Sequence, residues 1–324
     1  MNIEQMSWLM TCYNELSESI KKHNNSHAIL INGEKGIGRR ILAKNLAQDY
    51  LNISDFLNNG TTNPTEEESF HPDFKYIIPE EGKLNISIEK IRSTKLFLQL
   101  TSHQGIGKVV IIHPAESMTY PAMNSLLKIL EEPPEDTLII LISESIKKLP
   151  QTIVSRTQIQ KIKNPSLKES INWLSGYGEE SWDDVLNIFG YRPILLQELG
   201  HEYFNSKIKA ISDDINSLAL RNTKPSQVAN SWKSEELDVN LSILYKWISN
   251  LIDGNLLNIK KSMPKSFEKL LQSDLDAEHC FQYLNEIATI RQYLLNGKAL
   301  NWNLQISNLL LPIYSDAKGL IKNG

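Results

Sequence analysis

The chain has 324 residues, which is too long for one ordinary hydrophobic core and predicts two or three domains. Its hydrophobic content of 41% and charged content of 22% are typical of a globular protein, and they exclude a fibrous or disordered chain. The formal net charge of -4 gives no overall attraction to nucleic acids, so any such contact must be local or supplied by partners.

The two cysteines, Cys12 and Cys280, lie far apart and are too few for a disulfide framework or a four-cysteine metal site. They favour a reducing, cytoplasmic setting. No apolar run approaches the roughly 20 residues of a membrane helix, and the first residues lack the order of a secretion signal. We therefore expect a cytoplasmic protein without membrane contact.

The first half of the chain alternates between strand-like and helix-like segments. The strand-like runs are residues 27–31, 76–78, 109–112 and 138–142. The helix-like segments are residues 41–51, 88–100 and 121–130. This alternation predicts an α/β domain with a mainly parallel sheet. The polar, turn-rich residues 58–68 predict an exposed insertion.

A glycine-rich loop, G-E-K-G-I-G-R-R, joins the first strand to the first helix and matches the spacing of the phosphate loop G-x-x-x-x-G-K-[ST]. Its glycines are Gly33, Gly36 and Gly38. The lysine position holds Arg39 and the hydroxyl position holds Arg40, and an arginine cannot ligate a cation. We predict a degenerate, inactive phosphate loop. Whether it still binds an anion, or its arginines are simply solvated residues at a helix start, stays open.

The strand at residues 109–112 is the place where a nucleotide hydrolase carries an acidic pair, for magnesium and for the attacking water. Here the strand is followed by His113 and Pro114, and Glu116 lies two residues further on. His113 is a poor magnesium ligand and Pro114 has no functional group. The chain therefore lacks the acidic pair, although His-Pro is also an ordinary strand end.

An apolar helix at residues 121–130 must stop at Pro133-Pro134, because proline lacks the backbone donor and clashes with the preceding turn. A buried strand follows, and then Arg156 stands among small polar residues. An arginine at such a place is usually a solvated surface charge.

Beyond residue 162 the strand pattern gives way to helical periodicity. A break at residues 164–166 places a boundary near Lys163. Residues 165–200 predict about three short helices, and longer ones follow at residues 242–252, 280–295 and 304–314. The aromatic residues at helical spacing there favour packing over base stacking: Trp247, Phe281, Tyr283 and Trp302.

Several motifs of the first half resemble the delta-prime subunits of the bacterial DNA polymerase III clamp loader, a family of the AAA+ superfamily. They are S-H-A-I-L at 26–30, H-P-D-F at 71–74, K-V-V-I-I at 108–112, N-S-L-L-K-I-L-E-E-P-P at 124–134 and L-P-Q-T-I-V-S-R-T at 149–157. The run at 124–134 is long and specific. The helical remainder matches the family in pattern and length.

The resemblance implies three parts: an AAA+ α/β core with a degenerate phosphate loop at residues 1–162, a small helical lid at 163–203, and an all-α collar for oligomerisation at 204–324. Delta-prime relatives commonly carry a four-cysteine zinc module before the H-P-D segment. Residues 51–70 contain no cysteine, so we expect no metal.

The resemblance also implies a ring subunit for DNA replication within a DNA-directed DNA polymerase holoenzyme, a nucleotidyltransferase. Its partners would be the gamma/tau and delta subunits, with the sliding clamp and primer-template DNA reached through the complex. The family's Ser-Arg-Cys element corresponds to Ser155, Arg156 and Thr157, with threonine in place of cysteine.

In this family the arginine of that element reaches ATP-Mg held by an adjacent gamma/tau subunit, so the resemblance implies an arginine finger and no cofactor of the chain's own. The turn at residues 131–134 would then be scaffolding that directs Arg156 outward. Two alternatives stay open. One is an autonomous AAA+ ATPase, which the altered loop and missing acidic pair count against. The other is an interaction scaffold in which Arg156 makes only a surface salt bridge.

Overall fold

The computed structural model describes residues 3–21, 27–53, 71–178, 180–257, 277–295 and 298–315. The chain divides into two compact units, one made of Met1–Tyr177 and Tyr191–Leu195, the other of Gly178–Gly190 and Leu196–Gly324. The insertion predicted at residues 58–68 lies outside the described residues. The division into core, lid and collar stays a prediction.

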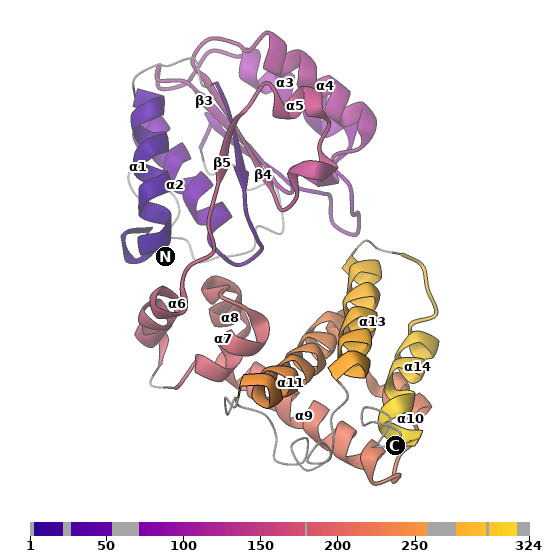
Figure 1. The fold of residues 1–324 in the computed structure, drawn as a ribbon. Helices are drawn as coiled ribbons and strands as arrows, with labels where there is room; N and C mark the ends of the chain where they lie inside the picture. Colours follow the sequence, from indigo (N-terminus) through magenta and orange to yellow (C-terminus); the bar gives the residue numbers. More distant parts are fainter. Residues whose placement is uncertain are drawn as a thin grey trace. The chain divides into compact units, whose positions relative to one another are not determined.

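A five-stranded parallel sheet forms the centre of the first unit (Figure 1). Its strands are β1 (Ala28–Asn32), β2 (Phe74–Ile77), β3 (Lys108–Ile112), β4 (Thr137–Ser143) and β5 (Gln158–Lys161), in the order β2-β3-β4-β1-β5. Every residue of β1, β3 and β4 is buried, as their apolar runs predict. The four predicted strands are confirmed. The edge strand β5 was not predicted, because Gln-Ile-Gln-Lys contains no apolar run.

Helices cover both faces of this sheet (Figure 1). On one face lie α1 (Ser7–Lys21) and α2 (Arg39–Leu51), and on the other lie α3 (Ile88–Gln99), α4 (Tyr120–Glu131) and α5 (Gln151–Val154). A single apolar cluster joins the second set of helices to the strands, with Leu130 of α4 and Ile153 of α5 among its members. The ends of α4 and α5 therefore share one core.

Helix α4 has sequence signals at both ends. The Thr119 hydroxyl accepts a hydrogen bond from the Ala122 N–H (3.4 Å), and Pro121 lies in the first turn, where its missing donor is harmless. The helix ends at Glu131, immediately before the residue that precedes Pro133-Pro134. The specific run at residues 124–134 is therefore a buried helix with a fixed end.

Helix α6 (Leu167–Leu174) completes the first unit, and the remaining helices are α7 (Asp183–Phe189), α8 (Pro193–Leu199), α9 (His201–Ala219), α10 (Pro225–Ser231), α11 (Leu237–Leu257), α13 (Ala277–Leu295) and α14 (Trp302–Ser315). Short 3₁₀ helices occur at Ile3–Gln5, Ala115–Ser117, Ile146–Lys148, Ser175–Tyr177 and Ser234–Glu236. The predicted fold class, an α/β core with a parallel sheet followed by an all-helical region, is confirmed for the described residues. Of the described helices, none combines the length and apolar character needed to span a bilayer.

Polar contacts tie the helices of the second unit together. The Tyr283 hydroxyl of α13 donates to the Leu309 carbonyl of α14 (2.6 Å). Trp247 and Tyr283 are buried, so their predicted packing role is confirmed. The same prediction is wrong for Phe281, which is 51% exposed, because its position on α13 faces away from the apolar side of that helix.

Candidate functional site

Arg156 lies in the turn between α5 and β5, and its guanidinium reaches the surface. One terminal nitrogen, Nη2, forms an ion pair with Oε1 of Glu131 at 2.8 Å, and Nη1 donates to the Thr152 carbonyl at 3.1 Å. The side chain is 37% exposed. The arginine therefore stands on a fixed turn with part of its guanidinium open to solvent.

The hydroxyls beside Arg156 are used within the turn. Ser155 donates to the Thr152 carbonyl (3.2 Å), and Thr157 donates to the Val154 carbonyl (3.0 Å). These bonds satisfy carbonyls at the end of α5, which have no partner inside so short a helix. Within this motif, Ser155 and Thr157 shape the backbone, and Arg156 is the group that presents charge.

The degenerate phosphate loop joins β1 to α2, as predicted, and its last arginines begin the helix. Arg39 is 5% exposed, and its Nη2 forms an ion pair with Oε1 of Glu144 at 2.8 Å. Its Nη1 is buried with no hydrogen-bond partner among the described residues. The alternative in which both arginines are solvated is therefore wrong for Arg39, because its side chain is buried and forms an ion pair with Glu144, the residue after β4.

Residues of α1 and α8 pack directly on the loop backbone. The Ile194 N–H donates to the Gly36 carbonyl at 3.1 Å. A Cβ added at Gly36 would lie 2.4 Å from the Leu195 Cβ, and one added at Gly38 would lie 2.6 Å from Cδ1 of Leu9. The two glycines are thus required by close approach as well as by their positive φ angles of 87° and 101°.

Substitution of Gly36 by alanine is expected to lower the free energy of unfolding by about 2–4 kcal/mol, because a strained φ adds to a clash with the backbone-proximal Cβ of Leu195. Gly82 offers the matched control, since its φ is also positive (73°) but nothing lies within 4 Å of an added Cβ. Its alanine variant should lose only about 1 kcal/mol. Urea unfolding measures both, and equal losses would contradict the close packing on the loop.

The end of β3 carries a neutral imidazole where a hydrolase has its acidic pair. Burial first, and then the charges of Arg39, Arg40 and Lys35, lower the pKa of His113 to about 3. Its Nδ1 lies 3.3 Å from the Tyr76 hydroxyl. At neutral pH His113 therefore carries no charge and offers no carboxylate oxygen for magnesium.

Two carboxylates do lie near this edge, and one oxygen of each makes an internal contact. Glu116 Oε1 accepts the Glu144 N–H at 2.9 Å, and Glu144 in turn pairs with Arg39. The sequence prediction missed Glu144. Glu144 could have been predicted from its position directly after β4, because the carboxyl ends of parallel strands meet at one edge of the sheet.

The described part of the chain contains no group of three His, Cys, Asp or Glu side chains that could hold a metal ion. Residues 54–70, which include most of the place of the relatives' zinc module, lie outside the described residues. The expected absence of metal therefore stays an expectation.

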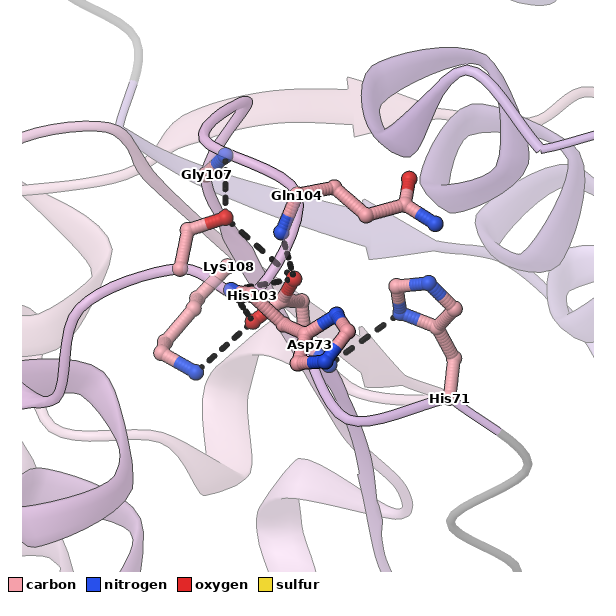
Figure 2. A network of polar contacts seen from close by, with 7 residues as sticks. His71, Asp73, His103, Gln104, Gly107 and Lys108 are labelled. Atoms are coloured by element: carbon pink, nitrogen blue, oxygen red, sulfur yellow. Dashed lines mark hydrogen bonds and ion pairs between the residues drawn. The ribbon is translucent and has the colours of Figure 1, made fainter.

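The H-P-D-F motif forms a buried polar cluster at the amino ends of β2 and β3 (Figure 2). The Asp73 carboxylate accepts hydrogen bonds from His103 N–H (2.9 Å), Gln104 N–H (3.2 Å), Ser102 hydroxyl (3.2 Å) and Lys108 Nζ (2.9 Å). Burial raises the pKa of Asp73, but these donors outweigh it and lower the pKa to about 2. Every donor belongs to the loop before β3 or to its first residue, so the cluster fixes that loop to the sheet.

Comparison with known proteins adds to this picture. The family model described as DNA polymerase III, delta subunit, matches residues 9–166. The DNA polymerase III subunit delta' of Pseudomonas aeruginosa is 29% identical over 316 residues, covering 88% of this chain and 91% of the relative. That of Bacillus subtilis is 36% identical over 151 residues, 44% of each chain.

Among solved structures, a DNA polymerase III gamma subunit-related protein of Thermotoga maritima aligns with a TM-score of 0.49 and 21% identity, covering 94% of this chain and 99% of its own. The family match spans the sheet, the altered loop and the Arg156 turn, and the Pseudomonas aeruginosa relative extends the match along the helical remainder. The chain is thus similar to DNA polymerase III delta-prime subunits over most of its length.

Proposed function

We propose that this chain is a clamp-loader subunit that hydrolyses no ATP and supplies Arg156 to the ATP site of an adjacent gamma/tau subunit. The observation that carries the proposal is the difference in exposure between the arginine of the phosphate loop and Arg156. Arg39 of the degenerate loop is buried against Glu144, whereas Arg156 stands at the surface on a turn fixed to the core. Arg156 can thus reach a neighbouring subunit, whereas the chain's own phosphate loop lacks the residues needed for hydrolysis.

The non-hydrolysing part rests on the loop and on the end of β3. Arg40 replaces the hydroxyl that would hold magnesium, and neutral His113 stands where carboxylates are needed. Ile194 and Leu195 pack on the loop backbone from outside. These changes remove the usual ligands of a catalytic metal from this part of the described structure.

The proposed partners follow from the similarity to delta-prime subunits. They are the gamma/tau and delta subunits, and through the assembled complex the sliding clamp and primer-template DNA, in the cytoplasm. Helices α9 to α14 would provide the collar. A plain scaffold is the second candidate, because the contact between Arg156 and Glu131 is also what a surface salt bridge looks like.

The purified chain is expected to turn over no MgATP above the buffer rate, whereas adding it to the gamma/tau and delta subunits should raise their ATPase in the presence of clamp and primed DNA. A coupled phosphate-release assay measures both. Turnover by the chain alone would revive the autonomous ATPase, and partners that neither bind the chain nor respond to it would refute the subunit role.

A further inference from the structure

We propose that Glu131 is the positioning residue for Arg156, and that its carboxylate holds the guanidinium in the orientation from which it contacts a neighbouring triphosphate. The inference rests on the proposed function and adds a residue to it. Glu131 belongs to the specific run at residues 124–134. The other residues of this run form α4 and the turn that ends it.

The contacts of Arg156 fix the plane of its guanidinium. Glu131 Oε1 binds Nη2 at 2.8 Å, and the Thr152 carbonyl accepts from Nη1 at 3.1 Å. Because the two terminal nitrogens are held by two different groups, the planar guanidinium cannot turn about its last bonds without losing one of them. The ion pair therefore selects one orientation of a long side chain that would otherwise have many.

Both partners stand on elements that share one core. Glu131 is the last residue of α4, next to buried Leu130, and Arg156 follows buried Ile153 and Val154 of α5. These apolar neighbours belong to the same cluster under the sheet. The carboxylate and the guanidinium are therefore held at a constant separation by packed structure.

The position of Glu131 is electrostatically unfavourable for its own helix. The carboxyl end of a helix carries partial negative charge, and an acidic residue there is repelled by it. Arg156 places a positive charge at the same end and compensates. A carboxylate that weakens its helix and is paired with this arginine indicates a role in holding the arginine.

The ion pair leaves the arginine able to bind phosphate. A guanidinium has five N–H donors, and the two contacts engage one on each terminal nitrogen. The other donors can reach phosphoryl oxygens of a neighbouring site without release of Glu131. The pair therefore orients Arg156 and does not have to break before the arginine acts.

The test compares Glu131→Gln, Glu131→Asp and Glu132→Gln in the reconstituted complex with clamp and primed DNA. Glutamine removes the charge at nearly constant shape, aspartate keeps it, and the neighbouring Glu132 is the matched control at the same helix end. For the site that faces this chain, Glu131→Gln should lower kcat about tenfold with the KM for ATP unchanged, because orientation acts on the transition state.

Glu131→Asp should recover most of this rate, and Glu132→Gln should behave as the unaltered chain. In an Arg156→Ala background, Glu131→Gln should have no further effect, because nothing is left to position. Unfolding curves and gel filtration of the complex check that each variant folds and assembles.

A wild-type or higher kcat for Glu131→Gln would overturn the positioning role, and so would an equal fall in the Arg156→Ala background. If Arg156→Ala lowers hydrolysis but Glu131→Gln does not, the positioning role alone fails. If Arg156→Ala itself leaves hydrolysis unchanged, the proposed function fails and the positioning role fails with it.

Discussion

Replacement of Arg156 by alanine is expected, on the proposed function, to slow ATP hydrolysis about 10³-fold at the gamma/tau site next to this chain. The guanidinium would offset negative charge that develops on the transferred phosphoryl group, and alanine offers no charge in its place. In the proposed complex the other ATP sites keep their own residues, so total ATPase should fall only by the share of the affected site. Single-turnover hydrolysis by the preassembled complex should therefore split into a fast phase and a much slower one.

The same substitution should leave the fold intact. The ion pair with Glu131 is exposed at both partners (37% and 50%), and such pairs stabilise proteins by about 0–1 kcal/mol. Arg156→Lys is the matched control, because it keeps the charge and loses the planar fork, and it should recover part of the rate. Unchanged single-turnover kinetics for Arg156→Ala, with normal assembly, would favour the interaction scaffold.

The sequence predicted well those structural features that depend on residues close together in the chain. The apolar runs of β1, β3 and β4 and the stop at Pro133-Pro134 act locally, so strands, helix end and parallel sheet follow from them. Strand β5 was missed because an edge strand needs no apolar run, only the free edge of β1 to pair with. Arg156 was singled out by resemblance, since its local pattern fits any surface arginine.

Contacts between distant residues account for what the sequence did not predict. Arg39 and Glu144 are 105 positions apart, and their pairing depends on β1 and β4 lying side by side. The packing of Ile194 and Leu195 on the phosphate loop likewise joins residues that no local pattern relates. The sheet order brings Arg39 and Glu144 together, and the position of α8 brings Ile194 and Leu195 to the loop; both depend on the packing of the first unit.

The H-P-D-F motif leads to the largest expected effect on stability. Asp73 is fully buried and Lys108 is 4% exposed, so the Asp73→Asn substitution leaves a buried ammonium without its carboxylate. Such a loss costs about 3–5 kcal/mol. Urea unfolding at pH 7 measures it, and a loss below about 1 kcal/mol would contradict the burial of the pair.

The two partners of this pair are not equivalent. Asp73 also accepts from the loop at residues 102–104, whereas the Lys108 ammonium has the Phe97 ring, 4.4 Å from its centroid, as its other contact. Lys108→Met should therefore cost less than Asp73→Asn, since the carboxylate keeps its remaining donors. Adding Lys108→Met to Asp73→Asn should restore part of the stability, because it removes the unpaired buried charge. A double variant with a lower free energy of unfolding than Asp73→Asn alone would refute this account.

The pH dependence gives an independent check on Asp73. Its folded pKa of about 2 lies below the ordinary value near 4, so the unfolded chain takes up the proton first as the pH falls. The stabilisation from the carboxylate is therefore fully present above about pH 4 and is lost as the pH falls through about 2, by about 2 kcal/mol in all. Since asparagine does not titrate, the difference in unfolding free energy between the unaltered chain and Asp73→Asn should be constant from pH 7 to 5 and should narrow below pH 4. If this difference in unfolding free energy already narrows near pH 6, a titratable group other than Asp73 causes the effect.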